Sequence, residues 1–302
     1  MSELQAERTA AAVGRRRDPA GWARAQVREP YLQLLASQVL TGGVALAANI
    51  LMVRALSTSG RGEVALMLQV VYLTTQMLLL GTERSFVANY HDAAPAVAVR
   101  AFARLLLVPC VLGVAAAVVY TSVAPHRLNP GPAVVALLVT YGLVETAILA
   151  TRAVAIAAGR MAEFLYARVL ESLLLLALLV TLFVADVSHP TVWILAYLFA
   201  GAVPTTVFLV IWLRQPVGGA TEIPPGRNRA VRQEGLALFP AALSNMAMLR
   251  ADRLALPALA STSALGLYAS VATMTELLAW PLRAYADARL GKMAGDPPRG
   301  AG

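Results

Sequence analysis

The sequence predicts an all-α polytopic membrane protein. Hydrophobic residues make up 58% of the 302 residues and charged residues only 14%, against about 25% in a soluble domain. The apolar runs last about 20 residues, the length at which a helix crosses a hydrocarbon layer of about 30 Å. They do not alternate between apolar and polar residues, as the strands of a membrane β-barrel do. This composition excludes two soluble domains, which the chain length alone would allow.

Eight apolar runs are predicted to span the membrane. They divide the chain into an Arg-rich cytoplasmic tail with an interfacial segment (1–30), a six-helix lobe (31–213), a Pro- and Gly-rich linker (214–235), two further helices (236–282) and a second tail (283–302). The predicted spans are Tyr31–Val53, Val64–Gly81, Leu105–Ala124, Ala133–Ala157, Val169–Val187, Thr191–Leu213, Leu236–Ala260 and Ala264–Leu282.

The distribution of cations predicts the orientation of these spans. With the N-terminus inside, nearly all loop cations lie on the cytoplasmic side, and only Arg54, Arg61 and Arg127 lie in outer loops. We therefore expect both termini in the cytoplasm. All but one of the 25 cationic residues are Arg, the exception being Lys292, and this bias with heavy use of Ala is typical of a bacterial, GC-rich coding sequence. Anionic membrane lipid accounts for the basic loops without a nucleic acid partner.

Charged residues inside predicted spans are the candidates for substrate binding, because each costs roughly 2.5–3.5 kcal/mol at mid-helix and so calls for a partner or a function. One interpretation is a cavity wall whose guanidinium groups bind phosphate oxygens. The other is a set of structural ion pairs, or, for Arg152, a side chain that reaches to the membrane interface. The candidates are Arg250, Asp252 and Arg253 in the seventh span, Glu145 and Arg152 on a similar face of the fourth, and Glu276 in the eighth.

An internal repeat relates the turn after the first span to the turn after the seventh. At an offset of 204 residues, Ser57, Thr58, Ser59, Gly62 and Ala65 match Ser261, Thr262, Ser263, Gly266 and Ala269. An even number of spans separates the two copies, so both have the same orientation, as in transporters built from parallel repeats. The alternative is a chance similarity of two turns made of small residues, which suit helix starts in any case.

Two segments carry a resemblance to a known family. Val53-Arg-Ala-Leu-Ser-Thr-Ser-Gly-Arg-Gly-Glu-Val-Ala and Leu80-Gly-Thr-Glu-Arg-Ser-Phe-Val-Ala-Asn-Tyr90 resemble the start of polysaccharide and oligosaccharide flippases. Leu249-Arg-Ala-Asp-Arg-Leu254 with Leu265-Gly-Leu-Tyr-Ala269 resembles the seventh and eighth helices of that family. These flippases belong to the multidrug/oligosaccharidyl-lipid/polysaccharide exporter superfamily, which includes the MviN-like lipid II flippases. The resemblance implies two pseudo-symmetric six-helix lobes around a central cavity that is cationic in the MviN-like members.

The chain departs from that family in its number of helices. Family members usually have 12 to 14 helices, whereas this sequence offers one six-helix lobe plus the first two helices of a second lobe. Three explanations stay open. The chain is a truncated product, a second chain or a second copy completes the second lobe, or the protein has another role.

The resemblance implies translocation of a lipid-linked, undecaprenyl-type oligosaccharide or polysaccharide precursor across the bacterial cytoplasmic membrane. The first alternative is a non-transporting membrane subunit, or a truncated remnant, associated with a polysaccharide biosynthesis complex. A membrane glycosyltransferase is disfavoured because the outer loops are short and nearly free of acidic residues. No phosphate-binding, dinucleotide-binding or metalloprotease motif occurs, and the single Cys110 and scattered His residues predict no metal site. We therefore expect a protein that is not an enzyme and has no cofactor.

Overall fold

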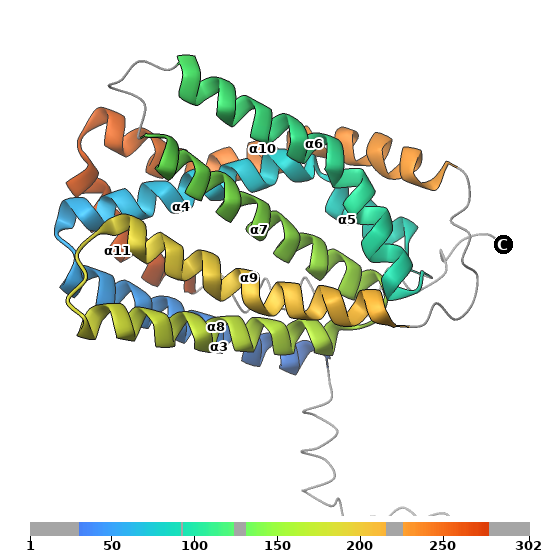
Figure 1. Cartoon of the computed structure of the whole chain (residues 1–302), viewed down its shortest axis with the longest axis horizontal. Coiled ribbons are helices and arrows are strands. Elements are labelled where there is room, and N and C mark those ends of the chain that lie inside the picture. The colour runs from blue at the N-terminus through green and yellow to red at the C-terminus, as the bar shows by residue number, and fades with distance from the viewer. Residues whose placement is uncertain (1–29, 92, 124–130, 216–225, 278–302) are drawn as a thin grey trace, which may run out of the picture.

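A computed structural model describes residues 30–91, 93–123, 131–215 and 226–277, apart from the side chains of 30–35, 123, 273–274 and 276–277. All regular elements within these residues are helices (Figure 1), which confirms the predicted all-α class. The predicted N-terminal tail with its interfacial segment, the C-terminal tail, residues 216–225 of the linker, the end of the eighth span and Arg127 lie outside the described residues.

The helices follow one another with short connections. Six of them are long and apolar enough to cross a membrane, and they coincide with the six spans predicted between residues 31 and 213. In chain order the helices are α3 (Pro30–Ala55), α4 (Thr58–Leu79), α5 (Thr82–Asn89), α6 (Pro95–Val123), α7 (Pro132–Ala157), α8 (Met161–Val184), α9 (Pro190–Arg214), α10 (Arg227–Leu259) and α11 (Thr262–Leu277).

Several helices extend beyond the predicted spans. Helix α4 begins at Thr58 because the Ser57 hydroxyl accepts a hydrogen bond from the Gly60 N–H (3.1 Å) and caps the helix. Helix α6 begins at Pro95, and α10 begins at Arg227 with a charged first turn. The predicted seventh span lies within α10, which is not among the six membrane-length apolar helices, and the apolar part of α11 in the described residues is shorter, Thr262–Ala272.

Arginines gather at one end of the bundle. Helices α4, α7 and α9 run toward this end, and α3, α6, α8 and α10 run away from it (Figure 1). We call it the basic end and define it by the arginines at these helix ends: Arg84, Arg100, Arg104, Arg152, Arg160, Arg214, Arg227, Arg229 and Arg232. Among the described residues, the opposite ends of the helices carry Arg54 and Arg61, with Arg250 and Arg253 in the last ten residues of α10. The charge asymmetry read from the sequence is therefore an asymmetry between the two ends of the folded bundle.

The two copies of the internal repeat have the same local structure. The offset of 204 carries the last residue of α3, Ala55, onto the last residue of α10, Leu259, and the first residue of α4 onto that of α11. The Ser261 hydroxyl accepts from the Ala264 N–H at 3.1 Å, which repeats the cap that Ser57 forms on α4. Helices α10 and α11 thus repeat the helix–turn–helix unit of α3 and α4.

The repeats also pack directly on each other, through glycine. A Cβ atom built on Gly62 would overlap the carbonyl of Thr262, and one built on Gly266 would overlap the carbonyl of Thr58. Thr58 and Thr262 are themselves equivalent in the repeat, so each copy makes the same contact with the other. The Ser59 and Thr262 hydroxyls lie 3.5 Å apart beside this contact. The turns are therefore related by a local twofold axis, and small residues permit the close approach.

We predict that Gly62→Ala lowers the free energy of unfolding by about 1–3 kcal/mol, because a methyl group at this site cannot be accommodated without moving backbone. Gly43→Ala is the matched control, since nothing lies within 4 Å of a Cβ at Gly43 and removing a glycine from a helix is favourable. Tryptophan fluorescence during heating in detergent reports the melting temperature. Equal melting temperatures for the two variants would contradict the contact.

Candidate functional site

A polar cavity of about 310 Å³ lies among seven helices. Its volume is at the lower end of the range of small-molecule sites, roughly 300–1,000 Å³. Both repeats contribute to the wall, because α3 and α4 face it together with α10 and α11, and α7, α8 and α9 supply the remainder. The polar side chains that line it are Thr41, Asn49, Arg61, Gln69, Tyr141, Glu145, Arg168, Glu171, Ser172, Tyr197 and Arg253.

Arg61 is buried in this wall, with 5% of its surface exposed. Its Nε and Nη2 atoms donate to Asn49 Oδ1 at 3.1 and 2.8 Å, and Asn49 Nδ2 donates to the Ser270 carbonyl at 3.1 Å. Within the described part of the chain, Arg61 Nη1 and the buried Oε1 atom of Gln69 have no hydrogen-bond partner. Buried polar atoms are nearly always paired, so these two atoms carry unsatisfied hydrogen-bonding capacity in the cavity wall.

The placement of Arg61 corrects the sequence-based prediction, which assigned it to an outer loop. Helix α4 begins at Thr58, so Arg61 belongs to its first turn and faces the bundle. The signal was present in the sequence as the Ser57 cap, which starts the helix before its apolar run begins.

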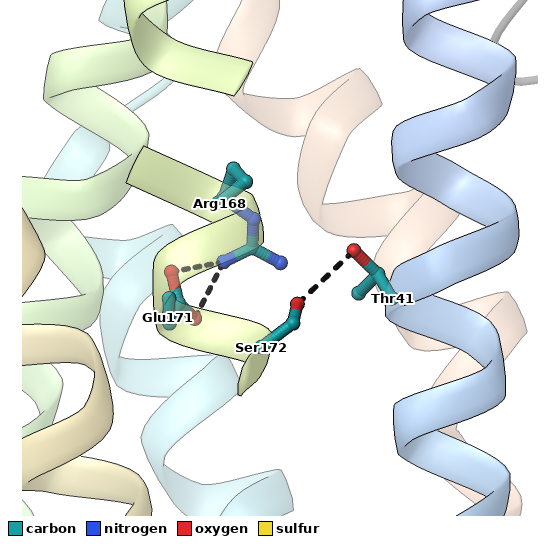
Figure 2. Close-up of polar contacts among 4 residues, drawn as sticks. All are labelled: Thr41, Arg168, Glu171 and Ser172. Atoms are coloured by element: carbon teal, nitrogen blue, oxygen red, sulfur yellow. Dashed lines mark hydrogen bonds and ion pairs between the residues drawn. The ribbon is translucent and has the colours of Figure 1, made fainter. Parts of the chain in front are cut away.

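A second arginine of the cavity is held by an ion pair. Arg168 Nη1 lies 2.7 Å from both carboxylate oxygens of Glu171, one turn further along α8, while its other terminal nitrogen points away from Glu171 toward the α3 side (Figure 2). The Ser172 hydroxyl lies 3.4 Å from the Thr41 hydroxyl and joins α8 to α3 (Figure 2). The charge pattern of the sequence places Arg168 among the cytoplasmic loop cations, whereas the structure puts it in α8 beside Glu171. An Arg–Glu spacing of three residues inside a continuous apolar helix is the signal that could have found it.

Two of the predicted candidates lie in this cavity. Arg253 is buried, with 8% of its surface exposed, and it enters the cavity from α10. Glu145 enters from α7, where it shares a side-chain hydrogen bond with Tyr141, one turn earlier. The sequence placed these residues in different spans, and the fold brings them to one site.

The other two candidates of the seventh span lie outside the cavity. The Arg250 guanidinium carbon lies 5.2 Å from the centre of the Tyr72 ring on α4, and the exposed Asp252 accepts a hydrogen bond from the Tyr268 hydroxyl. Of the two arginines, Arg253 lines the central cavity and Arg250 does not. Residues three apart differ by about 60° around a helix, and the aromatic face of Tyr72 attracts the Arg250 cation.

Arg152 also lies apart from Glu145. It lines a smaller cavity of about 130 Å³ together with Glu83 and Arg84. Seven residues of helix separate the two side chains by about 10 Å along α7, so a shared face does not put them at one depth. The side chain of Glu276 lies outside the described residues.

Helix α10, which carries Arg253, is fastened to α5 at the basic end. Glu234 accepts hydrogen bonds from the Ser85 hydroxyl (2.6 Å) and from Asn89 Nδ2 (2.9 Å). The Tyr90 hydroxyl donates to Asn228 at 2.5 Å. Burial raises the pKa of Tyr90, although nearby cations oppose this shift, so the phenol remains protonated and able to donate at neutral pH. These contacts, together with the α4–α11 contact, fix the position of α10 at both of its ends.

The lining residues give the cavity an excess of positive charge when all are ionised. Three arginines, Arg61, Arg168 and Arg253, stand against Glu145 and Glu171. Because Glu171 already pairs with Arg168, the site is suited to an anion. In the described part of the chain there is no group of three or more His, Cys, Asp or Glu residues that could hold a metal ion.

The fold and the cavity define a multi-pass, all-α membrane protein with a polar site between two repeated helix pairs. No family model, curated protein or solved structure matches the chain. The resemblance to flippases therefore stays a hypothesis based on short motifs.

We predict that Asn49→Ala destabilises the protein by about 1.5–3 kcal/mol, because it removes the acceptor of a buried, charged donor and one link to α11. Asn245→Ala on α10 makes the same change at an exposed position and should leave stability nearly unchanged. Chemical or thermal unfolding in detergent distinguishes them. If both variants unfold like the wild type, Asn49 does not hold Arg61 as described.

Proposed function

We propose that this protein moves an anionic, lipid-linked saccharide precursor across the bacterial cytoplasmic membrane. The observation that carries the proposal is the central cavity, with Arg61, Arg168 and Arg253 in its wall and a buried Nη1 atom on Arg61 that has no hydrogen-bond partner among the described residues. Guanidinium groups bind phosphate oxygens in paired, directional hydrogen bonds, and the diphosphate of a lipid-linked sugar offers several such oxygens.

The position of the cavity supports a transport role. It lies where α3 and α4 meet their repeat, α10 and α11, and transporters built from repeats bind their substrates at the interface between them. A volume of about 310 Å³ accommodates the charged head of such a substrate rather than a whole glycolipid. We propose that the diphosphate binds here while the lipid and the glycan extend beyond the cavity.

The basic end supports the proposed orientation. Cations accumulate on the cytoplasmic side of bacterial membrane proteins, so we propose that the basic end, with both chain termini, faces the cytoplasm. A reporter enzyme fused at His189, between α8 and α9, should then be active on the outer side.

The proposal is tested by transbilayer movement of a fluorescent polyprenyl-diphosphate disaccharide in liposomes that contain the purified full chain. Wild-type protein should expose the probe to a membrane-impermeant quencher faster than empty liposomes do. Arg253→Gln and Arg61→Gln should each slow this movement by about tenfold, since one charge-assisted hydrogen bond contributes about 1.4 kcal/mol or more.

Arg250→Gln provides the comparison for Arg253→Gln, because it removes the same charge one turn away and outside the cavity. It should retain most of the wild-type rate. The alternative role, a non-transporting subunit of a polysaccharide biosynthesis complex, predicts no probe movement above that of empty liposomes for any variant. A slow Arg250→Gln with a normal Arg253→Gln would place the substrate elsewhere.

A further inference from the structure

A second cavity lies at the basic end, between α5 and α7, and shares no lining residue with the central cavity. Its volume is about 130 Å³. One wall is the start of α5 and the other is a single face of α7. The lining residues are Glu83, Arg84 and Val87 on α5 and Leu149, Arg152, Ala153 and Ile156 on α7.

The depth of this cavity relative to the membrane follows from its distance to the ends of two spans. The α4 span ends at Leu79, five residues before Arg84, and the α7 span ends at Ala157, five residues after Arg152. Both guanidinium groups therefore lie near the boundary between hydrocarbon and lipid head groups, where basic side chains of membrane proteins meet lipid phosphates.

The lining has the chemistry of an amphiphile site. Arg84 and Arg152 together outweigh the single negative charge of Glu83. Leu149, Ala153 and Ile156 recur at i, i+4 and i+7 and form an apolar strip on α7 beside these charges, in which Ala153 is buried and Leu149 and Ile156 are partly exposed. A free phosphate would use only the arginines, whereas a phospholipid would use the arginines for its head group and the strip for an acyl chain.

We propose that this cavity binds the head group of an anionic membrane phospholipid, with an acyl chain along Leu149, Ala153 and Ile156. The bound lipid connects α5 to α7. Because α5 also holds Glu234 of α10 through Ser85 and Asn89, the lipid supports the helix that carries Arg253. This proposal is independent of the proposed function, since it concerns different residues and a resident lipid rather than a transported one.

Native mass spectrometry of the full chain, purified and delipidated in detergent, tests the proposal with phosphatidylglycerol and phosphatidylcholine as probes. One phosphatidylglycerol should bind per chain, in preference to phosphatidylcholine. The double variant Arg84→Gln with Arg152→Gln should weaken phosphatidylglycerol binding roughly 30-fold. Arg84→Lys with Arg152→Lys keeps both charges and should retain most of the binding, which separates loss of the site from loss of the fold.

The matched control removes two other arginines of the basic end, by Arg214→Gln and Arg229→Gln, both of which are exposed. This control should bind phosphatidylglycerol like the wild type. An equal loss in the control would show only a diffuse attraction to basic charge and would overturn the site. Displacement of the lipid by millimolar inorganic phosphate would also overturn it, because the ligand would then be a soluble anion that makes no use of the apolar strip.

Discussion

The reciprocal contact between Gly62 and Gly266 is the constraint on which the rest of the structure depends. It brings the backbones of α4 and α11 together, and no side chain larger than hydrogen fits on either side. The contact brings the Ser270 carbonyl within reach of Asn49, which in turn holds Arg61. It also fixes the turn that ends α10, and so the depth at which Arg253 enters the cavity. The close packing of the two backbones thus determines the positions of the charged side chains Arg61 and Arg253.

The cavity tolerates most of its charges because they have local partners. Arg168 is paired along its own helix with Glu171, Arg61 is held by an amide on α3, and Glu145 is bonded to Tyr141. Removing ions from water is expensive, and such pairing offsets much of that cost. The pairing is incomplete at Arg61, where Nη1 remains available among the described residues. Much of the charge in the cavity wall is thus compensated by residues of the chain itself.

The sequence predicted those features that depend on chain-long patterns. Hydropathy predicted eight spans, of which six coincide with membrane-length apolar helices, and a fixed offset identified the repeat, because both patterns rest on many residues. Single side chains were harder to place. Arg61 was assigned to a loop because a hydropathy window discounts a polar first turn. Arg250 and Arg253 could not be separated, since only the position of Tyr72 on another helix decides which of them enters the cavity. Such choices depend on neighbours that lie far away in the chain.

The local twofold relates backbones but not chemistry. Asn49 on α3 occupies the position that Arg253 occupies on α10, and Arg61 on α4 corresponds to the buried, apolar Leu265 on α11. The first helix pair thus contributes an amide and a guanidinium to the cavity wall, where the second contributes the guanidinium of Arg253, while Leu265 is buried outside the lining. If a ligand between the two helix pairs is rotated by 180° about the local twofold axis, its groups face different side chains. The two repeats therefore have symmetric backbones but different side chains, and this difference favours one orientation of a molecule bound between them.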